Sequence, residues 1–204
     1  INGARQVGKT WLLKEFGRQE FQNVAYINFD NNPRLAAQFD EGYDIPQLIA
    51  ALELETGEKV APGKTLIIFD EIQECPKALT SLKYFYENAP KYAIAAAGSL
   101  LGITIHKGTG YPVGKVDSLN LYPLSYREFL DAVGEKALRE VIDSGNQTLM
   151  NSFSTRFVSL LRKYYFIGGM PEAVEGFIET NTFAEVGKIQ EQILIGYERD
   201  ISKH

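Results

Sequence analysis

Eight residues near the start of the chain combine two glycines, a lysine and a threonine at a fixed spacing. They are Gly3, Ala4, Arg5, Gln6, Val7, Gly8, Lys9 and Thr10. This is the spacing of a phosphate-binding P-loop. Glycine lets the backbone approach a polyphosphate closely, because it has no Cβ, and successive N–H groups then form an anion-binding nest. We expect Lys9 to contact the β- and γ-phosphates of a nucleotide and Thr10 to offer its hydroxyl to Mg²⁺.

The residues that follow predict a helix whose positive end faces the bound anion. Trp11, Leu12, Leu13 and Phe16 share one helical face, and Gly17 is its predicted end. Trp11 is expected to lie against the nucleotide with the loop. An ordinary glycine-containing turn before a helix fits the same residues, so the interpretation depends on a strand before the loop. Only Ile1 and Asn2 precede Gly3, so we expect a fragment of a longer protein that binds nucleotide poorly alone.

A second stretch places two carboxylates directly after an apolar run. Residues 66–69 are apolar without alternation, and Asp70 and Glu71 follow them. Such a run predicts a strand covered on both faces of a parallel sheet, and these sheets hold their working residues at the carboxyl ends of strands. Asp70 is then expected to hold Mg²⁺, and Glu71 to orient or deprotonate a water beside the γ-phosphate. The alternative is a pair of exposed carboxylates at the start of a loop.

A further apolar stretch, Tyr92–Ala97, predicts a central strand that ends at Gly98 and Ser99. Ser99 would lie between the P-loop and Glu71, where it could contact the γ-phosphate or the attacking water; a cap or turn residue is the alternative. After it, glycines separate short β-like pieces at Ile103–Ile105 and Val113–Val116, and Ser118–Leu121 predicts an edge strand.

The remainder of the chain predicts helices. Capping boxes stand at Ser125–Glu128 and Thr182–Glu185, Gly168 and Gly169 break the pattern, and Pro171 opens a short helix. The predicted organisation is therefore a core over residues 1–122, with its first strand mostly missing, and a helical lid over residues 123–204.

Together these segments resemble the AAA+-type ATPases of bacteria and archaea that usually carry a C-terminal domain of unknown function. The resemblance is carried by Gly3–Thr10, Tyr26–Asp30, Ile68–Gln73, Ala97–Ser99, Leu121–Leu130, Gly168–Ala173 and Tyr197–Ile201. It implies an α/β fold: a three-layer P-loop NTPase sandwich with a parallel sheet of order 5-1-4-3-2, followed by a helical lobe. It also implies ATP with Mg²⁺, Thr10 and Asp70 as metal ligands, Glu71 as the catalytic glutamate with Lys9, and Ser99 as a sensor.

The sequence departs from the family pattern at two places. Leu100 stands where a second serine is common, and Gly114–Lys115 stands where Gly-Arg is common. A lysine meets phosphate as a point charge, without the two-pronged geometry of arginine. The residue that would act as an arginine finger therefore stays open among Lys115, Arg127 and Arg199, or none of them.

Composition limits the classes of function. The 204 residues are 45% hydrophobic with a net charge of −5 and show no basic cluster, so a packed core is expected and a nucleic-acid surface is not supported. Cys75 is the only cysteine, and His106 and His204 are far apart, which gives no metal-ligand spacing. No apolar run approaches the roughly 18 residues of a membrane helix. Without a signal peptide, we expect a reducing cytoplasm.

Three functions fit, in decreasing order. The first is Mg²⁺-dependent ATP hydrolysis. The second is a nucleotide-gated switch that binds ATP or ADP, turns over slowly and uses the bound state to order the helical lobe or an attached domain. Its partner would be a protein or a second copy of the chain, met through the missing flanking segments. The third, a metabolite kinase, is disfavoured because no arginine cluster is present to hold a second phosphorylated ligand.

Overall fold

The structure of the protein is a computed structural model that describes residues 1–30, 32–99 and 114–201 of the 204. The predicted β-like piece at 103–105 and the first residue of the piece at 113–116 lie outside the described residues. The chain forms two compact units. One contains Ile1–Ala4 and Gly8–Leu121, and the other contains Arg5–Val7 and the chain from Tyr122 onward. The proposal that residue 122 ends an independent domain stays a prediction.

The first unit is built on parallel strands. They are β1 (Asn2–Gly3), β2 (Asn23–Asn28), β3 (Thr65–Asp70), β4 (Ala93–Ala96), β5 (Gly98–Ser99) and β6 (Asn120–Leu121). Hydrogen bonding divides them into two ladders, β5-β1-β6 and β2-β3-β4, in place of the single five-stranded sheet that was predicted. Only Ala97 separates β4 from β5, and its N–H donates to the Phe69 carbonyl at 2.8 Å. If β4 and β5 are taken as one strand interrupted at Ala97, the spatial order of the strands is β6, β1, β4 with β5, β3 and β2.

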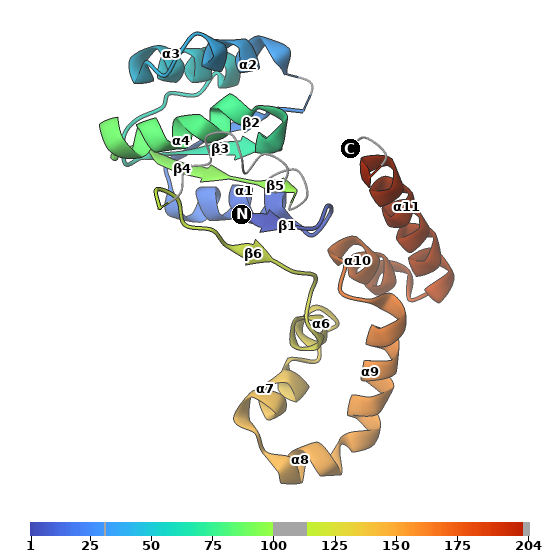
Figure 1. The fold of residues 1–204 in the computed structure, drawn as a ribbon. Coiled ribbons are helices and arrows are strands. Elements are labelled where there is room, and N and C mark those ends of the chain that lie inside the picture. Colours follow the sequence, from blue (N-terminus) through green and yellow to red (C-terminus); the bar gives the residue numbers. More distant parts are fainter. Residues whose placement is uncertain (31, 100–113, 202–204) are drawn as a thin grey trace. The chain divides into compact units, whose positions relative to one another are not determined.

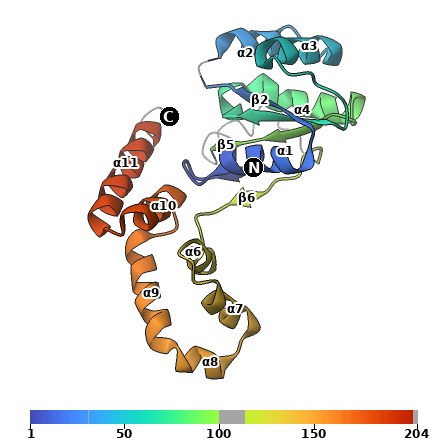
Figure 2. The ribbon, with the colours of Figure 1, turned by 180° about the vertical axis from the view of Figure 1, so that it is seen from behind.

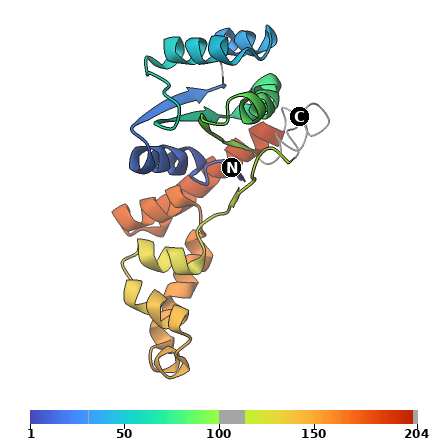
Figure 3. The ribbon, with the colours of Figure 1, turned by 90° about the vertical axis from the view of Figure 1, so that its left-hand side faces the viewer.

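Helices cover both faces of β3, as its unbroken apolar run predicts. The helices of this unit are α1 (Lys9–Glu20), α2 (Pro33–Asp40), α3 (Ile45–Thr56) and α4 (Pro76–Asn88), with a 3₁₀ turn, η1, at Ile72–Glu74. Ile67 and Phe69 pack in the core formed with α2, α3 and α4, whereas Leu66 and Ile68 pack against Leu13 of α1. In Figures 1 and 3, α1 accordingly lies on the opposite side of the strands from α2 and α3. The predicted α/β fold class is confirmed.

The predicted end of α1 at Gly17 is wrong, because the helix continues to Glu20. Gly17 is buried, and a Cβ there would lie 2.6 Å from Val24 Cγ2 on β2. The residue therefore permits close packing of the helix on the strand, and does not end the helix. By contrast, the residues at both ends of α3 suit its boundaries: Asp44 caps the start by accepting a hydrogen bond from the Gln47 N–H at 2.9 Å, and Gly57 ends the helix in the left-handed region.

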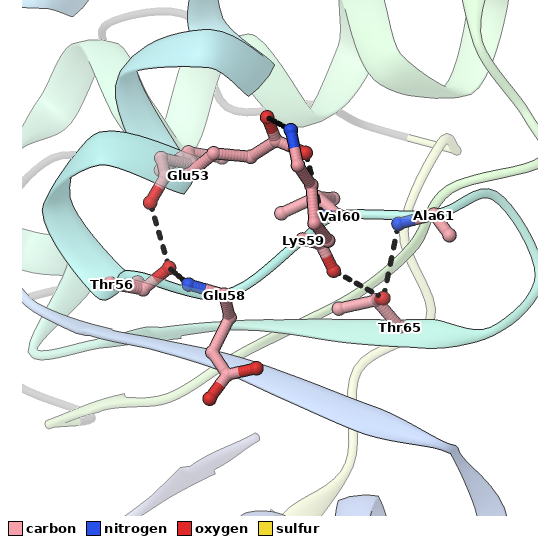
Figure 4. Close-up of polar contacts among 8 residues, drawn as sticks. Glu53, Thr56, Glu58, Lys59, Val60, Ala61 and Thr65 are labelled. Carbon is pink, nitrogen blue, oxygen red and sulfur yellow. Dashed lines mark hydrogen bonds and ion pairs between the residues drawn. The ribbon is translucent and has the colours of Figure 1, made fainter.

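A polar network holds the start of β3 against the connection from α3 (Figure 4). The buried Thr65 hydroxyl donates to the Lys59 carbonyl at 3.0 Å and accepts from the Ala61 N–H at 3.1 Å. Glu53 of α3 accepts from the Val60 N–H at 2.9 Å. Each of these bonds pairs a backbone group of the connection with a side chain of α3 or β3, and so ties the connection to both elements.

The second unit is helical. Its helices are α6 (Tyr126–Ala132), α7 (Lys136–Ser144), α8 (Gln147–Ser152), α9 (Ser154–Ile167), α10 (Pro171–Thr180) and α11 (Phe183–Ile201), which follow one another from yellow to red in Figure 2. The capping box at Ser125 and Glu128 is confirmed at the start of α6. Phe129 packs with Ile167 and Val174, while its neighbour Leu130 packs with Leu138 and Leu160. Both small cores therefore meet at α6.

Gly169 is a position where this unit tolerates no side chain. A Cβ there would lie 2.1 Å from the Leu124 carbonyl oxygen, and the Leu124 N–H donates to the Gly169 carbonyl at 2.7 Å. We expect Gly169→Ala to lower the free energy of unfolding by about 1–3 kcal/mol, because backbone must move to admit the methyl group. Urea denaturation followed by circular dichroism measures this change.

Gly187→Ala is the matched control for that variant. Gly187 lies within α11, and a Cβ there would have nothing within 4 Å. Alanine is favoured over glycine inside a helix by up to about 1 kcal/mol, so this variant should unfold at an equal or higher urea concentration than the parent. Equal midpoints for Gly169→Ala and the parent would contradict the close approach at Leu124.

Candidate functional site

The predicted P-loop connects β1 to α1, as its motif requires. Gln6 and Gly8 adopt positive φ angles of 60° and 96°. The second value lies in the left-handed region that glycine enters without a Cβ clash, which explains the residue type at position 8. Gly8 is also the N-cap of α1, and its carbonyl accepts from the Leu12 N–H at 2.9 Å. The loop thus leads directly into the positive end of a helix.

Lys9 lies across this loop. Its ammonium donates to the carbonyls of Gly3 at 3.1 Å and Ala4 at 2.7 Å, and the residue is only 7% exposed. The lysine ammonium is therefore held against the backbone of the loop. Trp11, which was expected to lie against the nucleotide, is 70% exposed at the start of α1; its contact with a ligand stays a prediction.

Thr10 and Asp70, the two predicted metal ligands, lie side by side. The Thr10 hydroxyl donates to Asp70 Oδ2 at 2.7 Å, although the residues are 60 positions apart in sequence. Asp70 is 3% exposed. The fold brings them together because α1 packs on β3, whose last residue is Asp70. This contact joins the start of α1 to the acidic end of β3.

Tyr26 of β2 is a member of this cluster that sequence reasoning did not select. Its hydroxyl donates to Asp70 Oδ2 at 2.9 Å, and the Lys14 ammonium lies 3.7 Å from the centre of its ring. Burial raises the pKa of the Tyr26 phenol, and the hydrogen bond to Asp70 raises it further, so the hydroxyl remains a donor. The sequence did contain a signal for this contact. Tyr26 lies within an apolar strand, and a buried phenol needs a hydrogen-bond partner, which the acidic end of a neighbouring strand can supply.

Glu71 occupies an unusual backbone conformation at the end of β3. Its φ angle is 50°, a region that non-glycine residues enter rarely and that costs about 1–3 kcal/mol. The Gln73 amide donates to Glu71 Oε2 at 2.6 Å, and the Gln73 oxygen accepts from the Ser99 N–H at 3.3 Å. Gln73 therefore links the predicted catalytic glutamate to the predicted sensor position. Sequence reasoning included Gln73 in the segment that follows β3 but gave it no role.

Each of the three candidates for an arginine finger, Lys115, Arg127 and Arg199, interacts with other groups in the structure. The Lys115 ammonium lies 3.5 Å from Glu87 and 5.0 Å from the centre of the Tyr86 ring, at the end of α4. Arg127 lies 3.4 Å from Asp143 within the helical unit, and Arg199 belongs to the last turn of α11. The choice among the three stays open.

The residues present fit Mg²⁺ held together with a nucleotide. The described residues contain no group of three or more His, Cys, Asp or Glu side chains that could hold a metal ion by themselves. Thr10 and Asp70 supply two hard oxygen atoms, and Mg²⁺ sites commonly combine one or two protein oxygens with waters and substrate phosphates. The donor set is therefore suited to a metal ion that arrives with phosphates.

A sequence model described as an AAA domain matches residues 1–130, which span the predicted P-loop, β3 and the whole first unit. The chain belongs to the AAA domain family. A second model, described as a domain of unknown function, matches residues 158–204, in agreement with the expected C-terminal domain of that kind. None of the curated proteins matches the chain. Among the described helices, none has the length and apolar character that a membrane crossing requires.

Proposed function

We propose that this AAA domain binds ATP with Mg²⁺ and hydrolyses it. The observation that carries the proposal is the 2.7 Å contact between Thr10 and Asp70. It places a hydroxyl from the start of α1 beside a buried carboxylate, with Glu71 as the next residue along the chain. Few other functions need a phosphate-binding loop, a metal-ligating pair and a second carboxylate at one edge of a sheet.

Each side chain then has a distinct task. The backbone N–H groups of Gly3 to Thr10 bind phosphate oxygens, and Lys9 adds a positive charge to them. Thr10 and Asp70 hold Mg²⁺, which neutralises phosphate charge when bound. Tyr26 restrains Asp70 through its hydrogen bond and so fixes the direction of the free carboxylate lone pairs.

Glu71 is the proposed base that orients the attacking water and accepts its proton. In the structure its carboxylate already accepts the Gln73 amide at 2.6 Å. Gln73 is thus the proposed positioning residue, since it ties the carboxylate to the Ser99 backbone. Catalysis in such a site comes mainly from positioning and electrostatic stabilisation.

The test is phosphate release from ATP across a Mg²⁺ titration. We expect turnover that depends on Mg²⁺, and we expect Asp70→Asn to raise the Mg²⁺ concentration for half-maximal rate by about tenfold, because a charged ligand becomes neutral. Asp40→Asn is the matched control: Asp40 is exposed at the end of α2 and pairs with Lys77 at 2.9 Å. No phosphate release at any Mg²⁺ concentration would contradict hydrolysis, and an unchanged Mg²⁺ dependence would remove Asp70 from its role.

A nucleotide-gated switch is the second candidate, and two observations favour it. Gln73 engages the Glu71 carboxylate, which would slow turnover if the bond persisted with nucleotide present. The helical unit also exposes large apolar side chains that a partner could cover, among them Tyr165, Phe166 and Leu194 at 76%, 52% and 61% exposure. This candidate requires partner binding that differs between ATP and ADP while phosphate release stays slow.

A further inference from the structure

One hydrogen bond ties the loop between β1 and α1 to the last helix. The Tyr197 hydroxyl of α11 donates to the Arg5 carbonyl at 3.0 Å, although the two residues are 192 positions apart. Residues Arg5–Val7 belong to the same compact unit as α11. The contact therefore reaches the middle of the predicted phosphate-binding loop.

The bonded carbonyl belongs to the peptide that precedes Gln6, a residue in an uncommon backbone conformation. Gln6 has a φ angle of 60°, in a region that residues other than glycine enter rarely. Its side chain is exposed, so packing of that side chain does not hold the angle. The φ angle describes rotation between the preceding carbonyl group and the Cα of Gln6. A donor that holds the Arg5 carbonyl therefore helps to hold Gln6 in this conformation.

The same hydrogen bond sets the direction of one loop N–H group. The peptide between Arg5 and Gln6 is trans, and in a planar trans peptide the carbonyl and the N–H point in opposite directions. Because the Arg5 carbonyl points toward Tyr197, the Gln6 N–H points away from it. Successive N–H groups of such a loop form the nest that binds an anion, and the Gln6 N–H is one of them.

The helix that carries Tyr197 is itself held firmly within its unit. Ile193 of α11 is only 4% exposed. The Gln190 amide donates to the carbonyls of Phe166 and Ile167, at the end of α9, at 2.8 Å and 3.1 Å. Tyr197 follows Ile193 by four residues and so lies on the same face of the helix, one turn further on. The hydroxyl is therefore presented from a well-anchored element.

We propose that Tyr197 is a positioning residue for nucleotide binding: its hydroxyl holds the Arg5–Gln6 peptide so that the Gln6 N–H faces the phosphates. This role rests on the proposed binding of ATP. Tyr197 lies outside residues 1–130, the part of the chain that matches the AAA domain. The effect is reciprocal by linkage: a contact that favours nucleotide binding is itself favoured, by the same factor, when nucleotide is bound.

The test is Tyr197→Phe, which removes the hydroxyl and keeps the ring. We expect the Kd for a fluorescent ATP analogue at fixed Mg²⁺ to rise about three- to tenfold, the worth of one hydrogen bond. Tyr164→Phe is the matched control, because the Tyr164 hydroxyl donates to the Leu124 carbonyl at 2.8 Å in the same unit. Both variants should lower the midpoint of thermal unfolding, but Tyr164→Phe should keep the parent's Kd.

A second variant tests whether Tyr197 acts through the conformation of Gln6. In Gln6→Gly the loop can adopt the positive φ angle without a Cβ clash, so the hydrogen bond has less to hold. In this background we expect Tyr197→Phe to raise the Kd by less than about twofold, since the two changes are coupled. An undiminished effect of Tyr197→Phe would show that the two residues act independently and would overturn the proposal.

The remaining outcomes separate this role from the proposed function. An unchanged Kd in Tyr197→Phe would overturn the role of Tyr197 and leave ATP binding in place. An equal rise in Kd in Tyr164→Phe would also overturn it, because a general loosening of the helical unit would then explain the loss. A parent chain that does not bind the analogue would overturn both proposals, and the parent's titration shows this before any variant is compared.

Discussion

Replacing Glu71 with glutamine is expected to lower the rate of ATP hydrolysis by about 10²–10³-fold while nucleotide binding persists. The substitution keeps the shape of the side chain but removes the group that would accept a proton from water. The hydrogen bond from Gln73 at 2.6 Å reaches the Glu71 carboxylate and not Lys9 or Thr10, so the phosphate-binding loop should be unaffected. Phosphate release measures the rate, and fluorescent-nucleotide titration measures the affinity.

Glu74→Gln is the control that separates this role from a loss of charge. Glu74 lies three residues further on, at the end of the 3₁₀ turn η1, and its side chain is exposed. The Glu74→Gln variant should therefore hydrolyse ATP at the parent's rate. Equal rates for Glu71→Gln and the parent would exclude Glu71 as the base. Loss of nucleotide affinity in Glu71→Gln would instead indicate that Glu71 shapes the loop.

The parts of this fold that local sequence encodes were predictable. β3 is buried at all six positions, and its run of apolar residues predicted both its burial and the placement of Asp70 and Glu71 at its end. The caps at Asp44 and Ser125 were also predictable, because a capping side chain and its backbone partner lie within three residues of each other.

The features that sequence did not predict depend on contacts between distant segments. Gly17 has the residue type of a helix end, but it is a packing position because Val24 of β2 lies against it. The bond from Tyr26 to Asp70 spans 44 positions, and the bond from Ser99 to Gln73 spans 26. From the sequence alone, a side-chain hydroxyl or amide could bond to many other polar groups. Which of these groups lies within reach is decided by how the parallel strands are aligned with one another.

Replacing Lys9 with alanine is expected to weaken nucleotide binding by about 10- to 100-fold, the loss of a charge-assisted hydrogen bond to phosphate. In the structure the Lys9 ammonium is held by the carbonyls of Gly3 and Ala4, and the residue as a whole is 7% exposed. Holding it beside the loop means that little side-chain entropy is left to lose when phosphate binds. Titration with a fluorescent nucleotide at fixed Mg²⁺ measures the change.

Lys14→Ala removes the same charge from the same helix and serves as the control. Lys14 is exposed one turn beyond the loop, with its ammonium 3.7 Å from the centre of the Tyr26 ring. A general electrostatic attraction between α1 and the nucleotide would weaken binding similarly in both variants, since the net charge changes equally. We expect Lys14→Ala to stay within a few-fold of the parent, because exposed charges are screened by salt and solvent. Comparable losses in the two variants would show that helix charge, and not the contact of Lys9 with phosphate, governs affinity.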